Sequence, residues 1–168
     1  SSESISLVFN RISDLFTPSE IIISEVEHQA PIIASNILKK RGWLIHEWKV
    51  NKYGIIDFTL GHNFINNKTK LVSVIWGQSE IGTLQPIQLI GKKCKDNNIL
   101  FHVDGTQIVN NGIFNWSELN CDLLSLSAHK FGGPKGVGIL FTNNFSRKLL
   151  CNSDISLTQE YSIRQGTQ

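Results

Sequence analysis

Short runs of β-branched and other apolar residues alternate with longer amphipathic segments along this chain, and this alternation constrains the fold more than any other feature. The strand-like runs lie at residues 21–24, 43–50, 71–76, 99–103, 122–126 and 136–142. Segments with helical periodicity lie at 4–16, 31–42 and 86–97, with a short helical turn at 116–119 and an exposed loop at 61–67. Strands that alternate with helices are typical of a parallel sheet with helices on its faces. The sequence therefore predicts an α/β fold, a mostly parallel sheet flanked by helices, and the alternating pattern fades after Asn143.

The length and charge of the chain fit a single globular domain. It has 168 residues and a net charge of +2, and domains of this size bury most of their apolar surface unaided. No apolar run approaches the ~18 residues of a membrane span. The basic segments at 68–70 and 92–95 are short and are interrupted by Thr69 and Cys94. We therefore expect no membrane and no nucleic-acid partner.

The cysteines favour a reducing compartment. The three of them, Cys94, Cys121 and Cys151, include no C-x-x-C pair, so neither a zinc cage nor a disulfide framework is predicted. Because no signal sequence is recognisable at the start, the default expectation is the cytoplasm. The sequence contains no Met, so we also expect it to be a fragment of a longer protein.

Polar side chains follow several of the predicted strands, at the point where each strand ends. They are Glu25, Glu27 and His28 after 21–24; Gln78, Ser79 and Glu80 after 71–76; Asp104 and Gln107 after 99–103; and Ser127, His129 and Lys130 after 122–126. The carboxyl ends of parallel strands meet at one edge of a sheet, where ligands bind. The sequence lacks a G-x-S-x-G nucleophile elbow, a G-x-G-x-x-G fingerprint and a Walker lysine loop. Hydrolytic triads and nucleotide cofactors are therefore disfavoured.

This set of side chains suits pyridoxal phosphate. That cofactor needs a lysine for a Schiff base and a carboxylate beside the pyridinium nitrogen, which we assign to Lys130 and Asp104. His28 is placed to lie flat on the ring, and Gln107 to donate to its phenolate oxygen. The phosphate is expected at Ser127 and His129, which offer hydroxyl and imidazole donors, and at Ser1 and Ser2, just before the first helix.

Each of these residues also has a simpler interpretation. Asp104 followed by Gly105 is more often a turn or cap residue. His28 taken alone fits a helix entry or the surface, and Lys130 fits a solvated loop. The functional interpretation depends on their coincidence at several strand ends.

Several motifs in order resemble one known family. They are residues 24–28 (SEVEH), 79–87 (SEIGTLQPI), 101–107 (FHVDGTQ) and 124–138 (LSLSAHKFGGPKGVG). Together they resemble the large domain of cysteine desulfurases of the NifS and IscS type, which are pyridoxal-phosphate enzymes of fold type I in the class V aminotransferase family. At the chain ends, residues 1–4 (SSES) resemble the close of that family's phosphate loop, and 164–167 (RQGT) resemble its Arg-x-Gly-Thr segment.

The resemblance implies specific roles and a reaction. The implied catalytic residues are Lys130 and His28, and the implied cofactor-binding residues are Ser2, His28, Ser79, Asp104, Gln107, Ser127, His129, Lys130 and Thr167. The residue matching Thr167 reaches the phosphate of a second subunit in this family, which implies a homodimer. The implied reaction takes sulfur from L-cysteine, leaves L-alanine and an enzyme persulfide, and supplies a sulfur-acceptor protein such as an iron–sulfur scaffold.

The sequence departs from the family pattern at a few positions. Gln78 and Ser79 stand where the family usually carries Asn-Asn, and Ser2 and Ile5 replace the usual Thr and Asn of the phosphate loop. None of the cysteines matches the persulfide-bearing residue, which the family carries further downstream. We therefore expect residues 1–168 to be the central part of a cofactor-binding large domain, without its N-terminal segment and small domain, and inactive alone.

Two rival functions follow from the same residues. One is a selenocysteine lyase or another class V aminotransferase, although the run 80–83 (EIGT) favours the desulfurase. The other is a degenerate, non-catalytic relative that binds a partner, which Ser2, Ile5 and Ser79 would suit.

Overall fold

The chain folds into a mostly parallel sheet covered by helices on both faces. The computed structural model describes residues 2–61, 64–108, 115 and 118–150. Its helices are α1 (Ser2–Leu15), α2 (Gln29–Lys40), α3 (Ile87–Asp96), a 3-10 helix η4 (Ala128–Phe131) and α4 (Asn144–Leu150). Its strands are β1 (Glu20–Ser24), β2 (Leu44–Trp48), β3 (Thr69–Ile75), β4 (Leu100–Asp104), β5 (Leu123–Ser127) and β6 (Gly138–Thr142).

The sheet has six strands in the order β2-β1-β3-β4-β5-β6. β1 to β5 pair in parallel, and only β6 runs antiparallel, beside β5. This confirms the predicted α/β class and the mostly parallel sheet. Because the parallel strands point the same way, the loops that follow β1, β3, β4 and β5 lie on one edge of the sheet.

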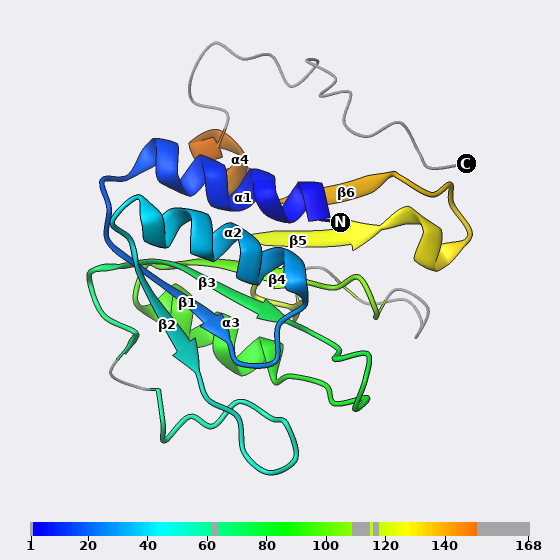
Figure 1. Cartoon of the computed structure of the whole chain (residues 1–168), viewed down its shortest axis with the longest axis horizontal. Coiled ribbons are helices and arrows are strands. Elements are labelled where there is room, and N and C mark those ends of the chain that lie inside the picture. The colour runs from blue at the N-terminus through cyan, green and yellow to red at the C-terminus, as the bar shows by residue number, and fades with distance from the viewer. Residues whose placement is uncertain (1, 62–63, 109–114, 116–117, 151–168) are drawn as a thin grey trace.

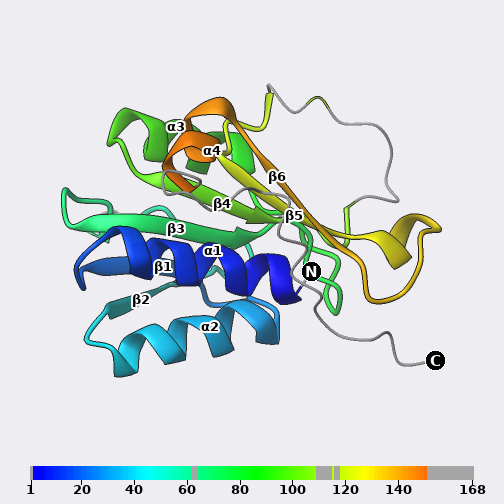
Figure 2. The same cartoon turned by 90° about the horizontal axis from the view of Figure 1, so that it is seen from above.

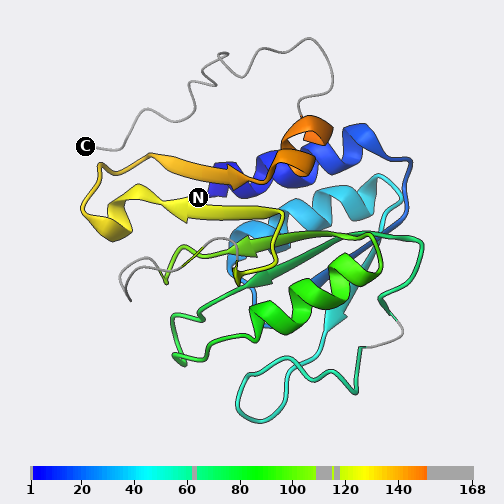
Figure 3. The ribbon, with the colours of Figure 1, turned by 180° about the vertical axis from the view of Figure 1, so that it is seen from behind.

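The core lies in two layers, one on each face of the sheet. α1 and α2 cover one face and α3 covers the other (Figures 1 and 3), and the view from above separates these layers (Figure 2). In β1 the side chains alternate accordingly: Ile21 and Ile23 pack with α1 and α2, whereas Ile22 packs with α3. Because β1 is buried on both faces, apolar side chains are favoured on both, which explains the continuous apolar run at its centre.

Helix boundaries follow local signals. The α1 residues Ile5, Val8, Phe9 and Ile12 are all buried and recur at helical spacing. α2 ends as predicted before Gly42, whose positive φ of +89° gives the chain its reversal into β2.

The sequence pattern fades after Asn143, yet α4 begins at the next residue. The Asn143 side chain accepts a hydrogen bond from the Ser146 backbone N–H at 2.7 Å, which caps the helix. The cap is legible in the sequence as Asn-x-x-Ser, but the helix is only 7 residues long and its periodicity is too short to register. The predicted turn at 116–119 lies partly outside the described residues.

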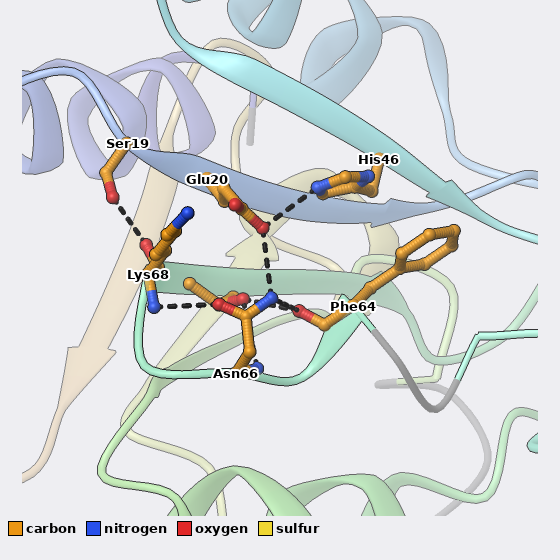
Figure 4. A network of polar contacts seen from close by, with 7 residues as sticks. Ser19, Glu20, His46, Phe64, Asn66 and Lys68 are labelled. Atoms are coloured by element: carbon orange, nitrogen blue, oxygen red, sulfur yellow. Dashed lines mark hydrogen bonds and ion pairs between the residues drawn. The ribbon is translucent and has the colours of Figure 1, made fainter.

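Residues 64–66 of the predicted exposed loop are partly buried. Asn66 donates through Nδ2 to Glu20 Oε2 at 3.1 Å, and His46 Nε2 lies 3.0 Å from the same oxygen (Figure 4). Burial alone would raise the pKa of Glu20, but the hydrogen bonds from Asn66 and His46 outweigh it and hold the pKa below its ordinary value. Glu20 is the first residue of β1, so this network stabilises the amino-terminal edge of the sheet.

Candidate active site

A cavity of about 280 Å³ opens at the carboxyl ends of the parallel strands. It is lined by Ser2, His28, Ile75, Ser79, Asp104, Thr106, Gln107, His129 and Lys130. Seven of these residues belong to the set named from the sequence. The structure therefore brings together side chains that come from four strand ends and from the first residue of α1.

Some predicted residues are not among those that line the cavity. Ser127, the last residue of β5, is buried, and its hydroxyl lies 3.0 Å from His129 Nδ1, so it contacts the cavity through that imidazole. Ser2 begins α1 itself, where the sequence places it just before the helix. Thr167, the segment 164–167, Cys151 and Ser1 lie outside the described residues.

Asp104 ends β4 and is only 3% exposed. Its Oδ1 accepts hydrogen bonds from the Thr106 backbone N–H at 3.0 Å and from the Thr106 hydroxyl at 2.5 Å. Asp104 is therefore both the turn residue and the site residue, two roles that the sequence presents as alternatives. Thr106 fixes one carboxylate oxygen, and the side chain still lines the cavity.

His28 also combines both interpretations. It is the N-cap of α2, and its Nδ1 accepts a hydrogen bond from the Ala30 backbone N–H at 3.4 Å. In the neutral ring that accepts this bond, the proton must be on Nε2. The helix cap thus selects the tautomer of a ring that lines the cavity.

Lys130 is presented by the short helix that follows β5. η4 spans Ala128–Phe131 and ends at Gly132, which has a φ of +86°. A residue with a Cβ is strained in that left-handed region, so glycine suits this abrupt end. The turn places the half-buried Lys130 and the exposed His129 side by side at the cavity wall.

A buried polar layer lies beneath Asp104. His102 precedes Asp104 by two residues and so faces the same side of β4. Its Nδ1 lies 2.8 Å from Ser73 Oγ on β3, and its Nε2 lies 2.9 Å from Ser125 Oγ on β5. Burial lowers the pKa of His102 to about 3, so the imidazole is neutral at physiological pH. The three side chains satisfy one another across three strands.

The loop that carries Ser79 is held by its neighbour. Gln78 Oε1 accepts from the backbone N–H of Glu80 at 2.5 Å and of Ile81 at 3.0 Å. Gln78, a departure from the family pattern, therefore folds back on its own loop, while Ser79 lines the cavity. Ile5, which also departs from the family pattern, lies on α1 and is fully buried in the core.

Sequence reasoning missed two lining residues, Ile75 and Thr106. Ile75 is the last residue of β3, so strand direction could have pointed to it. Thr106 is the third residue of Asp-Gly-Thr, a spacing at which a threonine commonly bonds back to an aspartate. Both were obscured because each has an obvious structural role.

A larger cavity of about 710 Å³ lies between α1 and β6. Its charged lining residues are Glu3, Arg11 and Asp14, and it includes no lysine.

Among the described residues, no group of three or more His, Cys, Asp and Glu could hold a metal ion. No helix in the described ranges is long and apolar enough to cross a membrane.

The smaller cavity has the donors that pyridoxal phosphate requires. Lys130 offers an amine, the buried Asp104 a carboxylate, and His28 an aromatic ring, all on one cavity. Gln107 adds an amide, and hydroxyl and imidazole donors come from Ser2 and His129. The residues present therefore fit a phosphorylated pyridine with an aldehyde group.

Comparisons with known proteins agree with this chemistry. The model of a family described as aminotransferase class-V matches residues 1–161. The mitosomal cysteine desulfurase of Trachipleistophora hominis is 39% identical over 150 residues, which covers 89% of this chain and 34% of that protein. The cysteine desulfurase IscS of Clostridium botulinum is 40% identical over 126 residues, which covers 75% of this chain and 32% of that protein.

Solved structures show the same fold. A NifS-like protein superposes with a TM-score of 0.80 and 31% identity, over 85% of this chain and 40% of that one. A structure of SspA in complex with cysteine gives a TM-score of 0.78 and 30% identity, over 85% of this chain and 42% of that one. The chain spans about a third of the length of the curated relatives it matches.

Proposed function

Because this chain belongs to the class V aminotransferase family, we propose that it forms the central part of the cofactor-binding large domain of a pyridoxal-phosphate cysteine desulfurase. The reaction moves the sulfur of L-cysteine onto an enzyme cysteine thiol, which gives L-alanine and a persulfide. One observation carries the proposal: Lys130, Asp104 and His28 line a single cavity although they lie at the ends of three different strands. The names of the curated relatives support the same reaction.

Each side chain has a distinct task in this proposal. Lys130 would bind the cofactor covalently, and Asp104 would face the ring nitrogen and favour its protonated form. When bound, pyridoxal phosphate would supply electron withdrawal from the substrate α-carbon. Thr106 keeps Asp104 in place through its two hydrogen bonds. Gln107 and Ser79 would contact the ring substituents, and Ser2, Ser127, His129 and, from a second subunit, Thr167 would hold the phosphate.

His28 would stack on the ring and donate a hydrogen bond. Because Nδ1 accepts the helix-capping bond from Ala30, the neutral ring donates through Nε2. That hydrogen bond leaves the cap intact, whereas proton uptake by the neutral ring would occur at Nδ1 and break the bond from Ala30.

The described cysteines are poor candidates for the persulfide. Cys94 and Cys121 are both buried, and burial, with the nearby charge of Asp122, raises the pKa of the Cys121 thiol to about 12. The pKa of Cys94 is raised further for the same reasons. A nucleophilic cysteine has to form a thiolate and reach the substrate. We therefore propose that the persulfide is carried outside the described residues.

The remaining assignments extend the same proposal. The protein acts as a homodimer in the cytoplasm and passes its sulfur to an acceptor protein for iron–sulfur cluster or thiocofactor assembly. Free thiols at Cys94 and Cys121 are compatible with a reducing compartment. Sedimentation of the purified protein and fractionation of the source cells test the dimer and the location.

The decisive experiment uses the complete protein that carries this sequence. With pyridoxal phosphate it should show a visible absorption band and release alanine from L-cysteine, and with an added thiol reductant such as dithiothreitol, which reduces the persulfide, it should also release sulfide. Lys130→Ala should lose the band and at least 100-fold in rate, since it removes the covalent attachment. Lys135→Ala, an exposed lysine five residues further along, is the matched control and should keep both.

The outcomes separate the rival functions. A wild-type protein without the band supports a degenerate, partner-binding relative. A protein with the band that turns over selenocysteine or another amino acid, but not cysteine, supports a different class V enzyme. Equal loss in Lys130→Ala and Lys135→Ala contradicts the assignment of Lys130.

A further inference from the structure

Glu27 is a carboxylic acid buried in the turn between β1 and α2, with 9% of its surface exposed. Its Oε1 accepts a hydrogen bond from the Ser24 hydroxyl at 2.7 Å and another from the Ile75 backbone N–H at 2.6 Å. Ser24 ends β1 and Ile75 ends β3, and these strands are neighbours in the sheet. A single oxygen therefore joins two strand ends at the edge where the cavity opens.

The second oxygen of Glu27 shows which form of the acid fits. Oε2 is buried and has no hydrogen-bond partner among the described residues. A carboxylate would leave an uncompensated negative charge on that oxygen, which costs more than the unpaired O–H of a neutral acid. Burial, and to a smaller extent the charge of Asp104, raise the pKa of Glu27 to about 8, against the hydrogen bonds from Ser24 and Ile75, which lower it.

Glu25 in the same turn shows the contrast. It is exposed and binds Lys49 Nζ at 2.8 Å and the Val50 backbone N–H at 3.1 Å, and these bonds lower its pKa. Glu25 thus ties the turn to the segment after β2, away from the cavity lining. Glu27 ties it to Ile75, a lining residue, and directly precedes His28 in the chain.

We propose that Glu27 is a positioning residue, which fixes His28 over the cavity by fastening the turn between β1 and α2 to the end of β3. The proposal rests on the function proposed above for the task of His28, but not for its geometry. Glu27 itself does not line the cavity and acts through its neighbour. What it supplies is a hydrogen-bond acceptor at Oε1, so an amide should replace it and a methyl group should not.

The test compares Glu27→Ala, Glu27→Gln and Glu25→Ala in the complete protein. The first readout is the imidazole NMR signal of His28 in the cofactor-free protein with isotope-labelled histidine, assigned with His28→Gln. Glu27→Ala should shift this signal, and in the loaded enzyme it should lower kcat by roughly 10-fold to 100-fold with KM changed less than threefold, the cost of a misplaced group. Glu27→Gln should restore both readouts to wild-type values, and Glu25→Ala should move neither.

Two results overturn the proposal. One is a His28 signal that stays in place in Glu27→Ala although the melting temperature falls. The other is a Glu27→Gln variant that behaves like Glu27→Ala. If Glu27→Ala does not fold, Ser24→Ala replaces it, because it removes one of the two hydrogen-bond donors to Glu27. Ser24→Ala should shift the His28 signal away from its wild-type position, and an unshifted signal would count against the proposal. A wild-type protein that lacks the cofactor band would contradict the proposed function. The NMR comparison uses cofactor-free protein, so it would still test the role of Glu27.

Discussion

His28 and Asp104 show how single residues carry structural and chemical tasks at once. The first caps α2 and lines the cavity, and the second closes a turn with Thr106 and lines the same cavity. From the sequence these tasks look like competing explanations. In the structure they are compatible, because the capping bond uses one ring nitrogen and the turn uses one carboxylate oxygen.

Glu27 gives a prediction about pH and stability. Its pKa is raised from 4.5 to about 8, so the folded state holds a proton that the unfolded state releases. The stabilisation is fully present below pH 4.5 and is lost as the pH rises through about 8. Relative to Glu27→Gln, which does not titrate, wild type should therefore lose stability between pH 5 and pH 9.

Urea unfolding at several pH values measures this difference. We expect it to reach at least about 1.4 kcal/mol, the equivalent of one pKa unit. Glu25→Gln is the control, because its carboxylate is exposed and its pKa is lowered. A constant difference between wild type and Glu27→Gln across the range would show that Glu27 is ionised in the folded protein.

The strands determine where the site lies. Their parallel direction could be predicted from the sequence, but the burial of the polar side chains near them could not. The runs at 21–24, 71–76 and 99–103 alternate with helices, and parallel pairing then brings the polar residues behind them together. Which of those residues face inwards depends on packing across the sheet. Glu27 and His102 have polar side chains that are nearly inaccessible in the fold. No local sequence pattern predicts this burial. The partly buried Asn66 likewise gives no local sign of its partner Glu20, which is far away along the chain.

The Ser73–His102–Ser125 layer predicts non-additive mutations. His102→Leu should destabilise the protein by about 1–3 kcal/mol, because it leaves two buried serine hydroxyls without their partner. Replacing all three, as Ser73→Ala, His102→Leu and Ser125→Ala together, should recover part of that loss, since no polar group is then left unsatisfied. Chemical denaturation of the single and triple variants gives both values. A triple variant no more stable than His102→Leu would contradict this account.

On the scale of the whole molecule, the cavity depends on complete folding. Its lining runs from Ser2 to Lys130 and includes contributions after β1, β3, β4 and β5. A ligand that binds only this assembled site stabilises the folded state by mass action. Binding there is therefore linked to the stability of the entire domain.

Pyridoxal phosphate should accordingly raise the melting temperature of the complete, cofactor-free protein. At a concentration one hundred times Kd, the stabilisation is about 2.7 kcal/mol, which corresponds to a shift of several degrees. Lys130→Ala should reduce the shift and Lys135→Ala should preserve it. Differential scanning calorimetry measures both, and an equal shift in the two variants would contradict binding at this cavity.

The wide spacing of the lining residues along the chain also bears on biosynthesis. While a nascent chain is still leaving the ribosome, Ser2 is exposed long before Lys130 has been made, and the strands between them have yet to cross over. No early stretch of the polypeptide assembles the cavity lining by itself. If the proposed cofactor binds there, it does so only after the strands have paired, and it cannot guide their pairing.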